Sequence, residues 1–175
     1  LYALASERSA GNTVLFRKRP VDVERLDGFD FSKVDIAFFS AGGPVSAEFA
    51  PRAVEKGCVV IDNTSHFRND DDIPLVVPEV NSHALANHSG IIANPNCSTI
   101  QMVVALKPLY DAVGLRRVTV STYQAVSGAG KRAVEELAGQ TAALLSGQPA
   151  KPGVHSKQIA FNALPAIGPL QDNGY

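Results

Sequence analysis

Residues 36–61 read IAFFSAGGPVSAEFAPRAVEKGCVVI, and this stretch decides the fold. Two short apolar runs, Ile36–Phe39 and Cys58–Ile61, flank a Gly-Gly-Pro break and a segment whose apolar residues recur at helical spacing. Neither run alternates apolar with polar residues, which is typical of parallel strands that helices cover on both faces. Gly57 follows the helical segment, where a helix commonly ends on a left-handed residue. We therefore predict a strand–helix–strand unit with a right-handed crossover.

The same rhythm of strands and helices continues on both sides of this unit. Apolar and β-branched runs predict further strands at residues 1–5, 13–16, 21–26, 90–93, 118–123 and 158–164. Helical spacing predicts a helix whose apolar residues run from Ile100 to Val113, before a stop at Gly114, and a second helix at about residues 131–145. The alternation of the two kinds of element indicates an α/β fold.

Composition and charge exclude several classes of function. The chain has 175 residues, with 16 basic and 17 acidic side chains, and its longest basic cluster is Arg17–Arg19. This balance argues against binding to nucleic acid or to an anionic membrane surface. The apolar runs are far shorter than the roughly 18 residues that a membrane span needs, so we expect a soluble protein. Two cysteines are too few for a disulfide scaffold and suit a reducing cytoplasm, although one bridge between them stays open.

Cys97 is the first candidate for chemistry, because it lies in the first turn of a predicted helix, directly after Asn94-Pro95-Asn96. The positive end of a helix can lower a thiol pKa from about 8.5 into a range of roughly 3.5 to 7.5. The competing interpretation of this position is a small helix residue without a chemical role. Cys58, within Gly-Cys-Val-Val-Ile, is most simply a buried strand residue. No metal site is expected.

Three turns are candidates for contact with a cofactor. The turns at 40–43 and 127–130 carry glycines between a predicted strand and a predicted helix, where backbone N–H groups can approach a phosphate or a cofactor ring. Neither turn reproduces G-x-G-x-x-G, so glycine there also fits a purely conformational role. Arg8 and Ser9 offer a cation and a hydroxyl of the sort that select a 2′-phosphorylated dinucleotide, and the alternative is a solvated turn.

Six motifs occur in a single order along the chain. They are ASERSAG at 5–11, FSAGG at 39–43, VIDNTS at 60–65, VPEVN at 77–81, NPNCST at 94–99 and STYQAVSGAG at 121–130. Together they resemble the bacterial aspartate-semialdehyde dehydrogenases. The resemblance implies a partial Rossmann-like NADP-binding domain over residues 1–96, followed by part of a mixed α/β catalytic and dimerisation domain over residues 97–175. It also implies a homodimer or homotetramer for the complete enzyme.

The resemblance further implies a reaction and a set of site residues. Enzymes of this family use NADPH to reduce aspartyl 4-phosphate to aspartate 4-semialdehyde, with release of phosphate, in the biosynthesis of lysine, diaminopimelate, methionine, threonine and isoleucine. Cys97 matches the nucleophile that forms their thioester, and Gln124 matches the amide that orients the substrate. Arg68 and Asn96 match positions that bind substrate or phosphate. The cofactor-binding positions are matched by Arg8, Ser9, Ser40, Gly42, Ser127 and Gly128.

Ordinary structural roles remain open for several of these residues. Arg68 could form surface ion pairs with the acidic run at 70–72, Asn96 could serve its own turn, and Gln124 could be a polar residue at a strand end. The alternative functions are an enzyme similar to N-acetyl-glutamyl-phosphate reductase and a non-catalytic piece that binds only cofactor or a partner subunit.

The family's Gly-rich loop and its acid/base histidine fall outside the matched stretch. The loop precedes the position that Leu1 matches, and the histidine follows the position that Tyr175 matches. The chain's own histidines do not lie in the family's histidine motif; they are His66, His83, His88 and His155. We therefore expect the 175-residue chain to be inactive by itself.

Overall fold

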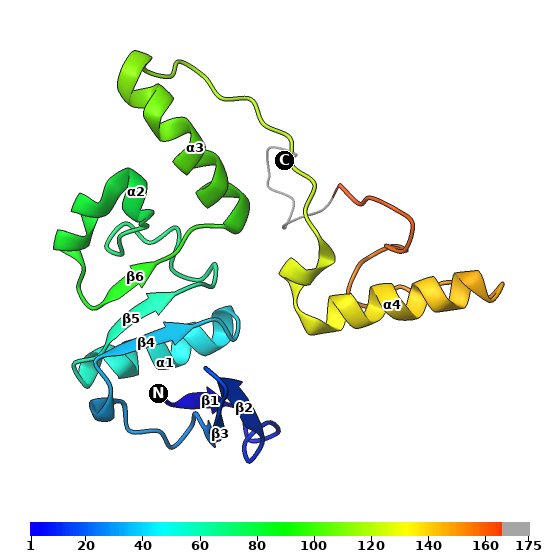
Figure 1. The fold of residues 1–175 in the computed structure, drawn as a ribbon, viewed down its shortest axis with the longest axis horizontal. Coiled ribbons are helices and arrows are strands. Elements are labelled where there is room, and N and C mark those ends of the chain that lie inside the picture. Colours follow the sequence, from blue (N-terminus) through cyan, green and yellow to red (C-terminus); the bar gives the residue numbers. More distant parts are fainter. Residues whose placement is uncertain (166–175) are drawn as a thin grey trace. The chain divides into compact units, whose positions relative to one another are not determined.

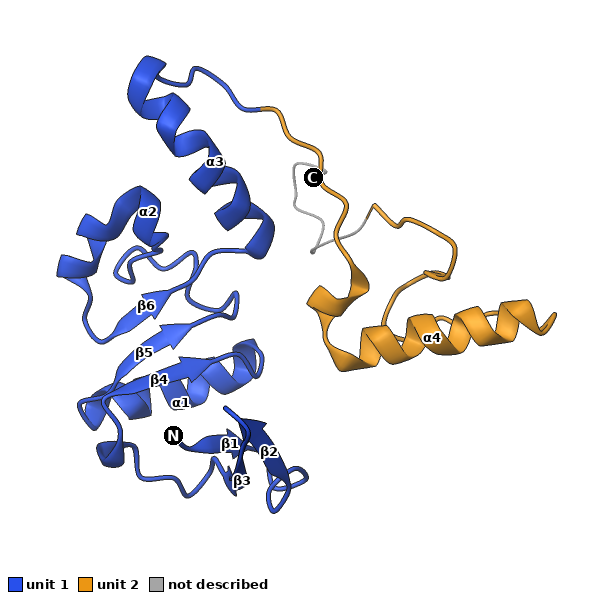
Figure 2. Cartoon of the chain, viewed as in Figure 1, with its two compact units in different colours: residues 1–118 blue, residues 119–175 orange. Residues whose placement is uncertain are grey.

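The computed structural model describes residues 1–165 of the chain. The chain divides into two compact units, residues 1–118 (unit 1) and residues 119–175 (unit 2), which Figure 2 shows in separate colours. The predicted division between Asn96 and Cys97 separates domains by function and stays a prediction. Residues 166–175 of the predicted second domain lie outside the described residues.

A three-stranded parallel sheet forms the centre of unit 1 (Figure 1). Its strands are β4 (Ile36–Phe39), β5 (Val59–Asp62) and β6 (Ile91–Ala93), paired in the order β4-β5-β6. Helix α1 (Gly43–Glu55) connects β4 to β5 and contacts both strands. Gly57 follows α1 with a φ of 83°, as a left-handed residue after a helix end requires. The predicted strand–helix–strand unit is therefore confirmed.

The core of unit 1 lies between α1 and this sheet. The buried face of α1 presents Phe49, Ala50 and Ala53, and β4 and β5 contribute Phe39 and Val60. Burying a phenylalanine of this kind stabilises a fold by roughly 1.5–3 kcal/mol. The small alanines allow the helix backbone to lie close to the strands. Burial thus explains the apolar run of β5, whose residues are buried or half-buried. Ile36 and Phe38 of β4 are exposed, so the prediction that both faces are covered is wrong for this strand within residues 1–165.

The N-terminal residues of unit 1 form a second small sheet. Strand β1 (Ala3–Ala5) pairs in parallel with β3 (Arg19–Arg25), and β2 (Thr13–Phe16) pairs with β3 in antiparallel register. The hairpin between β2 and β3 turns at Arg17 and Lys18, both of which have positive φ angles of 48° and 64°. Two left-handed residues in a two-residue loop match the twist of the strands on either side. The predicted early strands are confirmed.

Short helical elements and one long helix complete unit 1. The short elements are η1 (Phe31–Lys33), α2 (Pro78–Asn81) and η2 (Ser82–Asn87). The long helix α3 (Cys97–Val113) follows β6 and ends before Gly114, whose φ is 72° and whose N–H donates to the carbonyl of Tyr110 at 2.9 Å. Both ends of α3 agree with the sequence, which predicts Cys97 in its first turn and a stop at Gly114.

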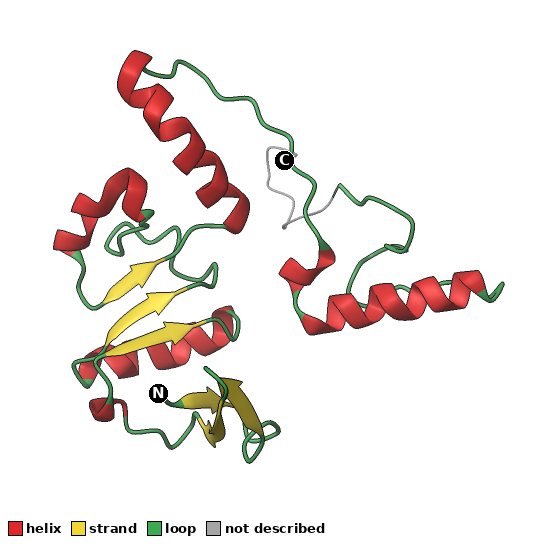
Figure 3. Cartoon of the chain, in the orientation of Figure 1, coloured by secondary structure: helices red, strands yellow, loops and turns green. Residues whose placement is uncertain are grey.

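Unit 2 contains η3 (Val126–Ala129) and α4 (Lys131–Leu145), of which the sequence predicts α4. The predicted strand at 118–123 is wrong: Figure 3 shows this segment as loop, and Val118, Val120 and Tyr123 are exposed. A β-branched run forms a strand only when a partner takes its backbone hydrogen bonds, and within residues 1–165 none pairs with it.

The predicted strand at 158–164 is also wrong. Two backbone N–H groups of this segment donate to the buried side chain of Gln140, on α4. Its Oε1 accepts from Ile159 at 2.9 Å and from Ala160 at 3.1 Å. The segment is therefore held as a turn against α4, because a side chain satisfies the donors that a neighbouring strand would otherwise satisfy.

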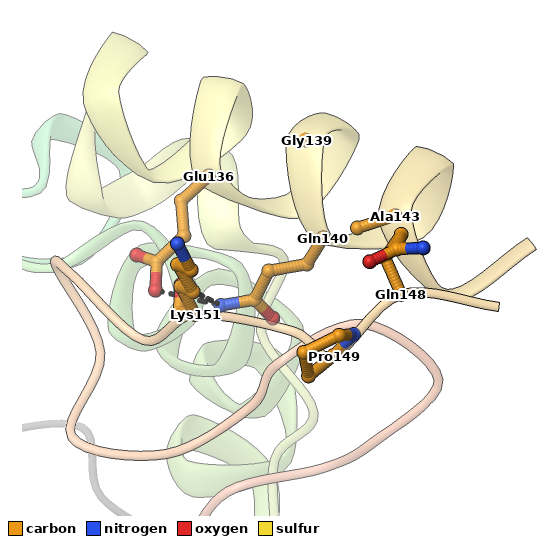
Figure 4. Close-up of a pocket in the computed structure, with 7 residues that line it drawn as sticks. All are labelled: Glu136, Gly139, Gln140, Ala143, Gln148, Pro149 and Lys151. Atoms are coloured by element: carbon orange, nitrogen blue, oxygen red, sulfur yellow. Dashed lines mark hydrogen bonds between the residues drawn. The ribbon is translucent and has the colours of Figure 1, made fainter. Parts of the chain in front are cut away.

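Glu136 holds the preceding loop against the same helix. Its carboxylate accepts the N–H groups of Gly153, Val154 and His155 at 2.8 to 3.1 Å. Burial disfavours the charged form, but these backbone hydrogen bonds outweigh it and lower the pKa of Glu136 from 4.5 to about 2. In Figure 4, Glu136 and Gln140 lie beside a groove of about 510 Å³ that Lys151 also lines. Both side chains are already engaged by the chain itself.

Two further observations concern residues 1–165 as a whole. None of their helices has the length and apolar character that crossing a membrane requires. Within the same range, His, Cys, Asp and Glu side chains form no group of three that could hold a metal ion.

Candidate functional site

The carboxyl ends of β4, β5 and β6 meet at one edge of the parallel sheet (Figure 1). The ladder continues one residue past each strand, because the N–H of Asn63 donates to Phe39 and the N–H of Asn94 donates to Asp62, both at 2.8 Å. Ser40, Asn63 and Asn94 are therefore neighbours in register at this edge, and we call these three residues the polar row. Ligands of open α/β sheets commonly bind outside the carboxyl ends of the strands.

Side-chain hydrogen bonds join the polar row. Asn94 Nδ2 donates to Asn63 Oδ1 at 2.6 Å, and Asn63 Nδ2 donates to Ser40 Oγ at 3.4 Å. Ser40 is among the residues predicted from the sequence, whereas the two asparagines are not. The signal that could have found them is that each lies within two residues of the end of a predicted strand and within one of the six motifs.

Arg68 ties together the loops that follow β5 and β6. Its Nε donates to the carbonyl of Asn94 at 2.9 Å, and its Nη2 donates to the carbonyl of Asn63 at 3.1 Å. The half-buried side chain forms no ion pair with another residue of the described chain, so the alternative of surface ion pairs with the acidic run does not hold there. A guanidinium has five N–H donors, and the two bonds leave others for a ligand. Arg68 thus lies beside the turn that leads to Cys97.

Asp62 is a fully buried carboxylate under this edge. It accepts from Ser46 Oγ at 2.7 Å, from the N–H of Thr64 at 3.1 Å and from Thr64 Oγ1 at 2.8 Å. Burying a charge is costly unless its hydrogen bonds are made, and here all three come from fixed neighbours. The carboxylate therefore attaches the loop after β5 to helix α1. The sequence analysis missed this role of Asp62.

Cys97 is the first residue of α3, and its thiol is free and exposed. Asn96 caps the helix: its Oδ1 accepts from the N–H of Ser98 at 3.0 Å, and its carbonyl accepts from Ile100 at 2.9 Å. Asn96 thus serves its own turn through its oxygen, while its Nδ2 forms no hydrogen bond within residues 1–165. The arrangement presents Cys97 to solvent at the positive end of a helix of 17 residues.

Cys58 has the opposite environment. It is free but buried, with 1% of its surface exposed, and its side chain belongs to the core under α1. Burial raises the pKa of this thiol, and the nearby Asp35 carboxylate raises it further. Of the two cysteines, only Cys97 is placed to react with a ligand.

The candidate cofactor residues of unit 1 lie in two turns. Arg8 is exposed and Ser9 is half-buried in a turn closed by the hydrogen bond from the N–H of Ser9 to the carbonyl of Ser6, at 2.9 Å. Gly42 caps α1 with a φ of 105°, and no side chain bonds to the N-terminus of that helix. Open helix N-termini favour anions, so this geometry fits a dinucleotide phosphate. Ser40 is exposed next to this turn.

The remaining candidates belong to unit 2. Gln124 is exposed, and its Oε1 accepts from Thr122 Oγ1 at 3.2 Å. Ser127 and Gly128 are exposed in η3, which leads through Gly130 into α4 without a side-chain cap. Within unit 1, the structure brings Arg68 together with the turn that carries Asn96 and Cys97, whereas Gln124, Ser127 and Gly128 are residues of unit 2.

Comparisons with known proteins agree with this geometry. The family model "Semialdehyde dehydrogenase, NAD binding domain" matches residues 1–88, and "Semialdehyde dehydrogenase, dimerisation domain" matches residues 106–175. An aspartate-semialdehyde dehydrogenase of Legionella pneumophila is 63% identical over 177 aligned residues, which are 100% of this chain and 51% of that protein. The chain thus spans about half the length of the curated relatives it matches.

Solved structures give the same result. The crystal structure of aspartate semialdehyde dehydrogenase II from Vibrio cholerae, complexed with ASA, has a TM-score of 0.95 and 61% identity, over 99% of this chain and 52% of that one. An aspartate semialdehyde dehydrogenase with NADP from Candida albicans has a TM-score of 0.54 and 28% identity, over 66% of this chain and 40% of that one. The resemblance carried by the six motifs is confirmed, as is the α/β fold with a Rossmann-like NAD-binding domain. The chain belongs to the semialdehyde dehydrogenase family.

Proposed function

We propose that this protein is an NADP-dependent aspartate-semialdehyde dehydrogenase that reduces aspartyl 4-phosphate to aspartate 4-semialdehyde and releases phosphate. The observation that carries the proposal is the exposed Cys97 thiol at the start of α3, beside the carboxyl edge of the parallel sheet. The identity of 61–63% to proteins of that name, over the whole chain, supports the substrate. The relatives reported above carry this name and not that of the N-acetyl-glutamyl-phosphate alternative.

In the proposed reaction, the Cys97 thiolate attacks the acyl carbon of aspartyl 4-phosphate. A carbon–sulfur bond forms, the bond between the acyl carbon and the phosphate oxygen breaks, and phosphate leaves with that electron pair. The hydride that NADPH would supply when bound adds to the acyl carbon of the thioester and gives the anion of a hemithioacetal. This anion forms the aldehyde C=O bond as its carbon–sulfur bond breaks, and the thiolate of Cys97 is released. A thiolate suits both halves because it attacks well and leaves well.

The residues around Cys97 are proposed to bind and orient the substrate. Two donors of the Arg68 guanidinium bond to carbonyl groups, and its remaining N–H groups are directed toward the phosphate. The planar guanidinium suits a bidentate contact with phosphate. Asn96 offers Nδ2 from the same turn, since its oxygen is occupied by the helix cap. The amide of Gln124 is proposed to orient the substrate near the thiol. These groups raise the rate by holding the acyl carbon in line with the nucleophile.

The cofactor is proposed to be NADP. Arg8 and Ser9 are proposed to contact the 2′-phosphate, Ser40 and Gly42 the dinucleotide, and Ser127 and Gly128 the nicotinamide end. Two features of the chain fit such a ligand: the uncapped N-terminus of α1 and the exposed Arg8 guanidinium, which has no ion pair within residues 1–165. Arg25 in the adjacent strand differs, because it is already paired with Glu7 at 2.9 Å.

The wider role is proposed on the same basis. We place the protein in the cytoplasm, as a homodimer or homotetramer, in the biosynthesis of lysine, diaminopimelate, methionine, threonine and isoleucine. The match to a dimerisation domain over residues 106–175 supports assembly of two subunits. Residues 1–96 are proposed to bind the cofactor, and residues 97–175 to belong to the catalytic and dimerisation domain.

The test is the reverse reaction of the full-length protein. Aspartate semialdehyde and phosphate should reduce NADP, measured by the absorbance of NADPH. Cys97→Ala should abolish turnover while NADP still binds, and Cys58→Ala is the matched control, because it removes the buried thiol and should affect mainly packing. Equal loss in both variants, or a preference for N-acetyl-glutamyl semialdehyde in competition, would overturn the proposal.

A further inference from the structure

Asn63 and Asn94 have no part in the proposed chemistry, yet both form side-chain and main-chain hydrogen bonds at the carboxyl edge of the parallel sheet. Their side chains are joined by the 2.6 Å hydrogen bond from Asn94 Nδ2 to Asn63 Oδ1. Their two carbonyls accept from one guanidinium, that of Arg68, at 3.1 and 2.9 Å. Their backbone N–H groups extend the sheet at 2.8 Å each. The same two residues are therefore joined through side chain and main chain at once.

We propose that Asn63 and Asn94 are positioning residues, which clamp the turn bearing Cys97 to the loop after β5 through their amide pair and through Arg68. The expected change in kcat rests on the proposed function, whereas the expected change in the order of the turn rests on the hydrogen bonds alone. It deepens that function, because it explains what holds the nucleophile and the phosphate-binding arginine in a fixed relation.

The local sequence makes this clamp necessary. Only three residues, Asn94, Pro95 and Asn96, separate β6 from Cys97. Pro95 has no N–H to donate, and the Asn96 side chain is directed to the helix cap. Asn94 is thus the residue that can anchor the turn to the neighbouring loop. Its partner Asn63 is itself held, because its Nδ2 donates to Ser40 Oγ at 3.4 Å.

The clamp also decides where Arg68 points. The Nε and one Nη of its guanidinium are committed to the two carbonyls, so the remaining donors take a direction that those carbonyls determine. Misplacement of a reacting group by about 1 Å can reduce a rate by on the order of a hundredfold. Loosening the amide pair should therefore lower kcat without removing any group that touches the ligand.

The test compares Asn63→Ala, Asn94→Ala and the double variant with Asn87→Ala in the full-length protein. Asn87 is the matched control, because it is exposed and its side chain makes no hydrogen bond within residues 1–165. Loss of one neutral hydrogen bond corresponds to a rate effect of about three- to tenfold. We expect kcat to fall by that factor in each single variant, with the KM for NADP unchanged in Asn94→Ala, which leaves Ser40 untouched. The double variant should fall no further than Asn63→Ala, because that substitution breaks the amide pair together with the bond to Ser40 Oγ.

Hydrogen exchange supplies a readout that does not depend on activity. The amides of Ser98 and Ile100, which bond to Asn96, should exchange faster in the two single variants than in the wild type. The amides of α1 should exchange at the wild-type rate in these variants, and all amides should do so in Asn87→Ala. Asn63→Asp keeps an acceptor for Asn94 Nδ2 and should restore protection. Additive losses in the double variant, a change in KM alone, unchanged exchange at Ser98 and Ile100, or faster exchange throughout unit 1 would overturn the proposal. An inactive wild type would refute the proposed function, and exchange would still test the clamp.

Discussion

Replacing Gly90 with alanine tests how tightly β6 is packed against α1. Gly90 precedes β6 with a φ of 104°, and its carbonyl accepts from the N–H of Val60 at 2.8 Å. A Cβ atom added there would lie 2.5 Å from Cγ1 and 2.9 Å from Cγ2 of Val54, a residue of α1. These are distances that real Cβ atoms do not reach, so either the helix or the strand must shift.

Two costs add at this position. A left-handed backbone costs a residue with a Cβ atom roughly 1–2 kcal/mol. Overpacking against Val54 costs typically about 1–3 kcal/mol. We expect Gly90→Ala to lower the free energy of unfolding by about 2–5 kcal/mol, a large share of the roughly 5–15 kcal/mol that stabilises a typical domain.

Gly57 provides the matched control. Its φ is 83°, but an added Cβ would meet no atom within 4 Å. Gly57→Ala therefore isolates the backbone cost, which is about 1–2 kcal/mol. The steric part belongs to the pair of Gly90 and Val54, so the cost of Gly90→Ala should shrink by about 1–3 kcal/mol in a Val54→Ala background.

The assay is urea unfolding followed by far-ultraviolet circular dichroism, applied to the four proteins of the Gly90 and Val54 cycle and to Gly57→Ala. Equal destabilisation by Gly90→Ala and Gly57→Ala would refute the reasoning. Strict additivity of the two substitutions in the cycle would do so as well. Either result would mean that β6 does not pack against α1 as closely as the distances to Val54 indicate.

Three further predictions concern the candidate site and unit 2. Asn96→Ala removes the cap that accepts from Ser98 and should destabilise the protein by about 1 kcal/mol in urea unfolding, whereas Asn96→Asp keeps an acceptor and should not; equal losses would contradict the cap. The pKa of Glu136 is lowered to about 2, so its contribution to stability should be complete above pH 4.5 and disappear as the pH falls toward 2. Glu136→Gln should flatten the acid limb of a plot of melting temperature against pH, and an unchanged slope would refute this assignment. Arg8→Ala should weaken binding of NADP more than that of NAD in fluorescence titrations, and equal weakening would remove the contact with the 2′-phosphate.

Much of the candidate site could be predicted because its signals are local. Cys97 is the first residue of α3 since Asn96 caps the helix and Pro95 ends the preceding extended segment, and three consecutive residues carry that information. The apolar run of β5 predicts its burial, because a strand covered on both faces has no polar positions. The same inference fails for β4, where Ile36 and Phe38 are exposed within residues 1–165.

The predictions of two strands were wrong because the local sequence does not show which distant residues take a segment's backbone hydrogen bonds. Residues 118–123 have the β-branched composition of a strand, but a strand exists only where another segment takes its hydrogen bonds. Residues 158–164 instead lie against α4, where Gln140, about 20 positions earlier in the chain, accepts from their backbone. The composition of a segment indicates which secondary structure it favours, whereas its hydrogen-bond partners decide which one it forms.

The amino-acid sequence alone determined the α/β class, the ends of α3, the place of Cys97 in its first turn and the family. It did so because the apolar spacing, the helix caps and the motifs are each contained in a few neighbouring residues. Only the tertiary structure decided that Ser40, Asn63 and Asn94 stand in one row, with Arg68 across two of them. The bonds that join the row link residues 23 and 31 positions apart, and parallel register over such distances is determined by how the strands pack, not by the residues between them.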